Sequence, residues 1–492
     1  MNPAMSPARH LVTSSLAFVL CVPLANAATL QVGPDKPYQT VNAAIAAAQP
    51  GDVIEIDEGM YVDDISTIDT NDLTIRGLGA GAHLHATQLL PNKKGIFAIN
   101  VDVGPITVEN LEFSGAAISP NDGNNGAGIR AQGTELIVHG CYFHDNQNGI
   151  LSGGSADALM TIEYSQFAYN GNPGSGQEHN VYISGDTAVL VFASNYSHHS
   201  YSGHTLKTRA QENHILYNRI MDEGDGSSSY IIDVPQGGLT YVVGNLLQQG
   251  PNAENKGTMI SYKREGQTND DLRLFLAHNT IVNDSGNQNT AFVRVGEASS
   301  IVLQNNLLVG PGTPVVFDGQ AAPVTDEGNL QTDMPMLVDL AGYDYHLLEG
   351  SPAIDAGVMV MAELVPTFQY VHVAERENRP VVDAPDIGAY EFGDVPPGDT
   401  TGDGDTTTGD GDTTTGDGDT TGSTGGSTGG DTSGTGGNDE VGDAGTGTGA
   451  DAGVGDEGAC SCSSGSESRD LAPTGLALLV LAGIRRRRQA RA

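Results

Sequence analysis

Ile215-Leu-Tyr-Asn218-Arg-Ile220 is the stretch that decides the fold, because its pattern returns along the chain. Each copy has an apolar residue three positions before a central asparagine and another two positions after it. The copies are Val242-Val-Gly-Asn245-Leu-Leu247, Leu276-Ala-His-Asn279-Thr-Ile281 and Leu303-Gln-Asn-Asn306-Leu-Leu308. A unit this short cannot bury its own apolar face, but a stack of such units buries a continuous core. The segment therefore predicts coils that lie on one another.

Weaker copies extend this pattern toward the N-terminus. They are centred on Asn195, Ser165, Cys141 and Leu111, and a stretch around Arg76 is a candidate for an earlier one. An asparagine at the same place on successive coils can both donate and accept through its amide, which predicts a ladder along the stack. Cys141 falls in this column, which favours a small buried core residue over a nucleophile.

The rest of this region favours an all-β chain. Short apolar runs alternate with turns, and the one good helical pattern is Thr40 to Ala48, which Pro50-Gly51 would end. We expect a single-stranded parallel β-helix, a solenoid with a short N-terminal capping helix. The alternative is a β-sandwich with asparagine-rich turns, which would show hairpin dipeptides and two-faced alternation.

The N-terminal residues have the pattern of an export signal. Arg9 and His10 precede an apolar stretch from Leu16 to Leu24, and Ala25-Asn26-Ala27 offers a small-residue cleavage site. We therefore expect residues 1–27 to be a signal peptide and 28–393 to be the β-helix domain. Cys141 is alone in that domain, so stability must come from core burial rather than from disulfides.

A long acidic segment follows the domain. Residues 394–458 are almost entirely Gly, Thr, Asp and Ser, and this composition predicts a disordered linker. The whole chain of 492 residues has a net charge of −39, which disfavours nucleic acid as a partner because phosphate repels it.

The last segment, residues 459–492, combines cysteines with an apolar run and four arginines. Cys460 and Cys462 precede Pro473-Thr-Gly475, an apolar run from Leu476 to Ile484, and Arg485 to Arg488. This order resembles the MYXO-CTERM sorting signal. The resemblance implies a short apolar helix, a sorting protease and the membrane as partners, processing or lipid attachment at Cys460, and display on the cell surface. A plain tail anchor or a fraying C-terminus is the alternative.

Two further stretches carry a resemblance for the domain itself. Val32-Gly-Pro-Asp-Lys-Pro-Tyr38 leads into the helical pattern, and Ser351-Pro-Ala-Ile-Asp355 is later followed by Asp386-Ile-Gly-Ala-Tyr-Glu391. Together they resemble right-handed parallel β-helix proteins of the pectin-lyase-like superfamily over residues 30–393. The resemblance implies the right-handed coil and a polysaccharide-lyase-like fold. That fold serves lyases, hydrolases and inert adhesins, so function must be argued from a site.

Period-two alternation predicts which polar side chains share a face. If Val181, Leu206, Ile232, Ile260 and Val293 point inward, one exposed column results. Its members are Tyr182, Lys207, Asp233, Ser261 and Arg294. His179 and His204 would occupy an inward or corner column beside it, and Tyr230 would lie near. His198 and His199 favour a loop role.

A patch of Tyr, Lys and Arg suits an acidic glycan. Eliminative cleavage of a uronate polymer needs a base beside the carboxylate and cations that neutralise it. We expect Arg209 to neutralise and Lys207 to be the base, with its pKa lowered by Arg209. Asp233, if adjacent, would raise that pKa, and His204 or Tyr182 would then be the base. Ser261, Tyr230 and Arg294 are the predicted substrate-binding residues.

Calcium is a second prediction of this region. Asp222, Glu223 and Asp225 offer the hard oxygen ligands that Ca²⁺ prefers, and an exposed acidic turn is the alternative.

The sequence thus predicts an exported, monomeric protein that acts on polysaccharide, first as a lyase of an acidic glycan. One alternative is a glycoside hydrolase, for which Asp222, Asp225 and Asp233 are the available carboxylates. The other is a surface protein that only binds glycan.

Overall fold

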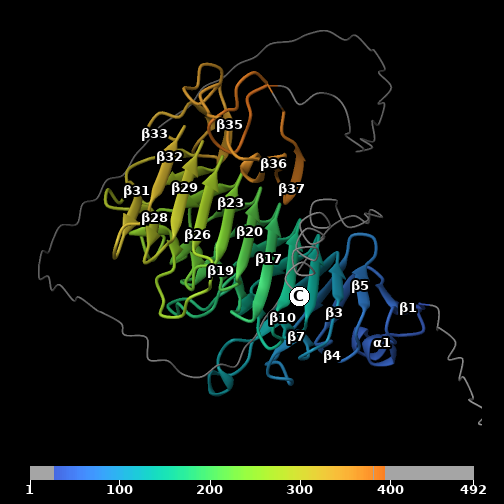
Figure 1. The fold of residues 1–492 in the computed structure, drawn as a ribbon. Helices are drawn as coiled ribbons and strands as arrows, with labels where there is room; N and C mark the ends of the chain where they lie inside the picture. The colour runs from blue at the N-terminus through green and yellow to red at the C-terminus, as the bar shows by residue number, and fades with distance from the viewer. Residues whose placement is uncertain (1–26, 381, 394–492) are drawn as a thin grey trace, which may run out of the picture. The chain divides into compact units, whose positions relative to one another are not determined.

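The computed structural model describes residues 27–380 and 382–393. There the chain winds into a right-handed parallel β-helix whose coils stack from α1 at one end to β33 at the other (Figure 1). The fold class predicted for the domain is confirmed. Most of the signal peptide, the linker and the sorting segment with Cys460 lie outside the described residues, so those assignments stay predictions.

Three parallel sheets run along the stack, and from β2 to β33 successive strands join sheets A, B and C in turn. Sheet A consists of β1 (Thr29–Val32), β2 (Val53–Ile56), β5 (Leu73–Gly77), β8 (Ile106–Glu109), β11 (Glu135–His139), β14 (Ala158–Glu163), β17 (Thr187–Ala193), β20 (Glu212–Leu216), β23 (Leu239–Val243), β26 (Arg273–Ala277), β29 (Ser300–Gln304) and β32 (Val324–Glu327). Sheet B consists of β3 (Gly59–Val62), β6 (Ala82–His85), β9 (Leu111–Ser114), β12 (Tyr142–His144), β15 (Gln166–Ala168), β18 (Tyr196–His198), β21 (Arg219–Met221), β24 (Leu246–Gln249), β27 (Thr280–Asn283), β30 (Leu307–Val309) and β33 (Leu330–Thr332). Sheet C consists of β4 (Ser66–Ile68), β7 (Gly95–Ile99), β10 (Ala127–Ala131), β13 (Asn148–Ser152), β16 (Val181–Ile183), β19 (His204–Thr208), β22 (Tyr230–Val234), β25 (Thr258–Tyr262), β28 (Ala291–Val295) and β31 (Thr313–Phe317).

The predicted asparagine ladder lies at the corner between sheets A and B. The side-chain amide of Asn218 donates to Asn245 Oδ1 at 2.9 Å, and the amide of Asn245 donates to Asn279 Oδ1 at 3.0 Å. The ladder runs from Asn195 to Asn306 as predicted and continues to Asn329. Each rung also accepts a backbone N–H, so these buried amides are satisfied without water.

The weak N-terminal copies of the repeat are largely confirmed. Ser165 accepts from the backbone N–H of Cys141 at 3.1 Å, and Cys141 is a buried free thiol, as its place in the column predicts. The centre predicted at Arg76 is wrong, because Arg76 lies within β5 and pairs in register with Glu109 rather than with Leu111.

The N-terminal end of the core is covered by α1 (Val41–Ala47), close to the predicted helix. The Thr40 side chain accepts from the Ala43 N–H at 3.2 Å, and Asp64 accepts from the first helical N–H, that of Val41, at 2.6 Å. Val41, Ala44 and Ile45 are buried in the core. The helix therefore shields the apolar end that the first coil would expose.

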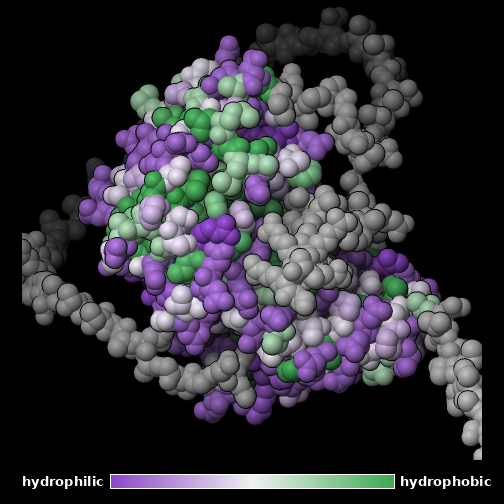
Figure 2. All heavy atoms as spheres, in the orientation of Figure 1, coloured by the Kyte–Doolittle hydropathy of each residue, from purple (hydrophilic) through white to green (hydrophobic). Residues whose placement is uncertain are grey.

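The C-terminal segment folds back on the outside of the stack. It contains the hairpins β34 (Leu337–Asp339) with β35 (Asp344–Leu347) and β36 (Phe368–Val371) with β37 (Glu375–Asn378). Short 3-10 turns lie at η1 (Pro120–Asp122), in an exposed loop between β9 and β10, and at η2 (Ala362–Leu364), in this segment. Figure 2 shows hydrophobic residues gathered over the half of the visible face that carries β23 to β35, whereas the end near α1 is mainly hydrophilic.

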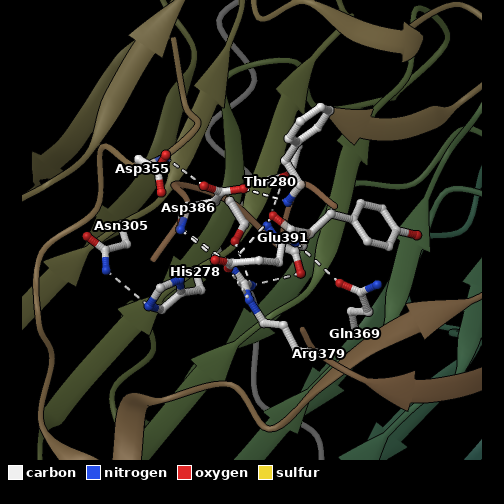
Figure 3. A network of polar contacts seen from close by, with 12 residues as sticks. His278, Thr280, Asn305, Asp355, Gln369, Arg379, Asp386 and Glu391 are labelled. Carbon is white, nitrogen blue, oxygen red and sulfur yellow. Dashed lines mark hydrogen bonds and ion pairs between the residues drawn. The ribbon is translucent and has the colours of Figure 1, made fainter. Parts of the chain in front are cut away.

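A buried ion pair anchors this segment (Figure 3). Arg379 donates to Glu391 Oε2 at 2.8 Å and also to the backbone oxygens of Gly388 and Ala389. The Ala389 N–H in turn donates to Thr280 of β27 at 3.1 Å. The ion pair thus fixes the stretch that resembles the closing segment of β-helix proteins, and the Ala389 N–H attaches this stretch to sheet B.

Candidate functional site

The predicted polar column exists on the outer face of sheet C. In register, Tyr182 pairs with Lys207, Lys207 with Asp233, Asp233 with Ser261, and Ser261 with Arg294. The alternation that assigns these residues to one face is confirmed, since the apolar residues between them are buried.

The predicted exposure of this column is wrong for two members. Only 2% of the surface of Asp233 and 1% of the surface of Ser261 are exposed to solvent. The loop between β25 and β26, residues 263–272, folds back over the column. Asn269 of this loop donates to the backbone oxygens of Arg209 at 3.2 Å and Gly237 at 2.9 Å. The loop thus turns part of an open wall into a covered site.

Glu265, at the start of this loop, reaches the two cations of the site. Its Oε1 lies 3.3 Å from Lys207 Nζ, and its Oε2 lies 2.5 Å from Arg209 Nη1. Asp233 Oδ2 lies 3.5 Å from Lys207 Nζ on the other side. Sequence reasoning missed Glu265, because a loop residue has no periodicity that would place it over a particular strand.

Tyr182 lies beside the same cations. Arg209 Nε donates to the Tyr182 hydroxyl at 2.9 Å, and both Lys207 and Arg209 lie over the phenol ring, with Lys207 Nζ 5.8 Å from its centre. Tyr182 is only partly buried. The phenol oxygen, the guanidinium and the Glu265 carboxylate therefore form one contiguous group that solvent can reach.

Two stacked histidines border this group, as the sequence predicts for a neighbouring column. The His179 and His204 rings are 4.8 Å apart, and His179 Nδ1 accepts from the backbone N–H of His204 at 3.0 Å. Burial holds the pKa of both imidazoles well below the usual value, so both are neutral. His204 Nε2 lies 3.4 Å from Asp233 Oδ2, and burial raises the pKa of Asp233 although Lys207 opposes it.

The other predicted substrate-binding residues lie further along the wall. The Tyr230 hydroxyl contacts Arg264 at 3.0 Å, and the Tyr230 ring lies 4.9 Å from that of His204. Arg294 pairs with Asp318 at 3.2 Å, the same carboxylate that Arg264 contacts at 2.6 Å. These side chains form a second polar group that Tyr230 links to the first.

The predicted calcium ligands do not come together. Asp222 accepts from the N–H groups of Ser228 at 3.0 Å and Gly250 at 3.1 Å, and burial raises its pKa to about 6. Glu223 pairs with Arg219 at 3.0 Å, and Asp225 pairs with His199 at 2.7 Å. Each carboxylate thus has protein partners of its own, and calcium stays a prediction from sequence alone.

The loop role predicted for the adjacent histidines is wrong for His198, which ends β18 and stacks on Tyr196 with 3.9 Å between ring centres. His199 follows the strand in a left-handed conformation, with φ of 48°. Both are buried.

Comparison with known proteins adds little to this geometry. No protein-family model and no curated protein matches the chain. Among solved structures, the chain is similar to one described as the crystal structure of pectate lyase Pel9A, with 14% identity and a TM-score of 0.47. That match covers 75% of this chain and 98% of the other. Within the described residues, no helix has the length and apolar character needed to cross a membrane.

Proposed function

We propose that this chain acts on an acidic, uronate-containing polysaccharide and cleaves it by β-elimination. The observation that carries the proposal is the contact of Lys207 and Arg209 with one carboxylate, that of Glu265, at 3.3 Å and 2.5 Å. A uronate carboxylate has the same charge and shape as this side chain. When the glycan binds, its carboxylate takes the place of Glu265 between the two cations.

The same two cations are suited to the chemistry of elimination. As a base removes the proton from the carbon beside the carboxylate, negative charge grows on the carboxylate oxygens. Fixed cations at this point stabilise that charge, and the planar guanidinium of Arg209 matches a carboxylate well. The electron pair of the broken C–H bond forms a double bond, and the bond to the departing sugar oxygen breaks. That oxygen takes up a proton from water, and the base returns its proton to solvent.

We assign the base to Tyr182 rather than to Lys207, which the sequence favours. Lys207 is ion-paired to both Asp233 and Glu265, so it serves better as a cation than as a proton acceptor. The Tyr182 oxygen accepts a hydrogen bond from Arg209 at 2.9 Å, and this contact holds the oxygen next to the carboxylate position. His204 is neutral but nearly enclosed, so we place it with Asp233 among the residues that position Lys207.

The remaining proposals concern substrate length and location. Tyr230 and Arg294 lie further along the same sheet and are partly exposed, so they are suited to bind neighbouring sugars, whereas Ser261 is too buried to reach a glycan. We also propose export and display at the cell surface, which rests on the sequences of residues 1–27 and 459–492. A glycan-degrading protein needs this location because its polymer cannot enter the cell.

Turnover of a panel of uronate polymers by the full chain tests the function. We expect ultraviolet absorbance from an unsaturated sugar product. Tyr182→Phe removes the oxygen that takes the proton, so it should lower kcat by about 100-fold or more with little change in KM. Arg209→Ala should raise KM and lower kcat. Arg273→Ala is the control, because Arg273 is exposed on sheet A, away from the site, and forms an ion pair with nearby Asp271.

Other products would point elsewhere. New reducing ends without the unsaturated product would indicate hydrolysis, and binding without any product would indicate a glycan-binding surface protein. Equal kcat for the wild type and Tyr182→Phe would remove Tyr182 as the base.

A further inference from the structure

A group of imidazoles and a carboxylate lies on the outer face of sheet B, near the N-terminal end of the stack and on a different sheet from the site above. In register, His83 of β6 pairs with Glu112 of β9, and His85 pairs with Ser114. Ser114 pairs in turn with His144 of β12. Since Leu84, Phe113 and Phe143 between them point into the core, these polar residues all point outward.

Two distances within this group are close to those of a tetrahedral metal site. Glu112 Oε1 lies 3.3 Å from His83 Nδ1 and 3.0 Å from His144 Nε2. One ligand atom from each of the three residues lies within 4.8 Å of the other two. Zinc–ligand bonds of about 2.0–2.1 Å in tetrahedral geometry place neighbouring ligand atoms about 3.3 Å apart. Only small side-chain shifts would therefore bring all three ligands onto one ion.

The surrounding hydrogen bonds are those expected of metal-binding histidines, which usually bind a second group through the other ring nitrogen. The remaining nitrogen of His144, Nδ1, contacts Asp145 Oδ2 at 2.7 Å. The remaining nitrogen of His83, Nε2, contacts Ser114 Oγ at 2.7 Å, and His85 Nδ1 contacts the same hydroxyl at 2.8 Å. The Asp145 carboxylate thus orients the His144 ring, and the Ser114 hydroxyl orients the His83 ring.

We propose that His83, Glu112 and His144 bind one divalent transition-metal ion, Zn²⁺ by donor set, with a fourth position left to solvent. Two imidazoles and one carboxylate suit zinc. The exposed fractions of the side chains are 18% for His83, 33% for Glu112 and 17% for His144, so an ion can reach them. Within the described part of the chain, no other three His, Cys, Asp or Glu side chains gather their ligand atoms in this way. The ion links three consecutive coils, β6, β9 and β12.

Titration of the metal-stripped full chain with Zn²⁺ tests this site. Because the acidic segment and Cys460 and Cys462 also offer ligands, the comparison is between variants. We expect the wild type to bind one more equivalent than His144→Ala, and Asp145→Asn to bind that equivalent about 10- to 100-fold more weakly. His214→Ala is the matched control, since His214 also pairs with a carboxylate, Glu212, at 2.9 Å, but on sheet A. It should bind as the wild type does.

Cobalt supplies an independent readout of ligand type and geometry. Co²⁺ in the wild type should give the visible absorption of a tetrahedral nitrogen and oxygen site, and this absorption should be lost in Glu112→Gln, which preserves side-chain size. Zn²⁺ should also raise the melting temperature of the wild type and of His214→Ala more than that of His144→Ala. Equal stoichiometry and equal spectra in the wild type, His144→Ala and Glu112→Gln would overturn the proposal.

Discussion

At the scale of single residues, the asparagine column connects one coil to the next. Asn245 Oδ1 accepts from both the backbone and the side chain of Asn218, and Asn245 Nδ2 donates to the Ile215 oxygen at 2.9 Å. All these groups are buried, so removal of one amide leaves several of them without partners. A buried group that loses its partner costs about 1–3 kcal/mol.

Asn245→Ala should therefore lower the free energy of unfolding by about 3 kcal/mol or more, as measured by denaturant titration. Asn329→Ala is the matched control at the end of the ladder, where the asparagine is only partly buried, and it should cost clearly less. Equal losses in the two variants would show that the ladder does not stabilise the stack.

The predictability of single residues depends on whether they belong to a repeat. Asn218 and Asn245 could be assigned from sequence because the same residue returns at the same place on each coil. The register of Lys207 with Asp233 followed from alternation in the same way. The Glu265 contact with Arg209 could not be predicted, since the path of the 263–272 loop depends on tertiary contacts such as those of Asn269.

At the scale of elements, the C-terminal segment attaches to the stack through groups that must keep one charge state. His278 follows β26 and its Nε2 accepts from Asn305 at 3.0 Å (Figure 3). Burial, with the nearby charge of Arg379, lowers the pKa of His278 from 6.5 to about 3. The folded chain thus holds this imidazole neutral where the unfolded chain would protonate it.

The sign of the pH effect follows from proton uptake on unfolding. Between about pH 6.5 and pH 3 the unfolded chain binds one more proton at His278, so stability is complete above pH 6.5 and falls as the pH falls. His278→Gln keeps an acceptor for Asn305 but cannot titrate. Denaturant titrations at several pH values should show that the free energy of unfolding falls by roughly 2–4 kcal/mol less in this variant than in the wild type as the pH is lowered from 6.5 to 3. Parallel curves for the wild type and the variant would contradict this account.

The sequence predicted elements well where a pattern is local. The helix at Val41–Ala47 has an N-cap threonine and a proline-glycine stop, and the strands have apolar alternation. The position of the C-terminal hairpins on the outside of sheets A and B could not be predicted from the sequence. It depends on single pairs such as Arg376 of β37 with Glu163 of β14, 3.3 Å apart, which no repeat in the sequence predicts.

At the scale of the whole molecule, the solenoid brings residues far apart in the chain onto one wall. Tyr182, Lys207 and Glu265 come from three different coils, and the stacking register places them together. Lys207 and Arg209 lie on the same coil, and by themselves they would be two ordinary surface cations. With Glu265 above it, the pair is already shown to accommodate a carboxylate, and the proposed function depends on this accommodation.

Affinity for a uronate oligomer in wild type and Glu265→Gln is the most direct test of that claim. Glu265→Gln keeps the size of the side chain but removes the charge that occupies Lys207 and Arg209. The account predicts about tenfold tighter binding of the acidic oligomer by Glu265→Gln, with no gain for a neutral oligomer. Unchanged or weaker binding of the acidic oligomer by this variant would contradict the claim that Glu265 holds the place of the substrate carboxylate.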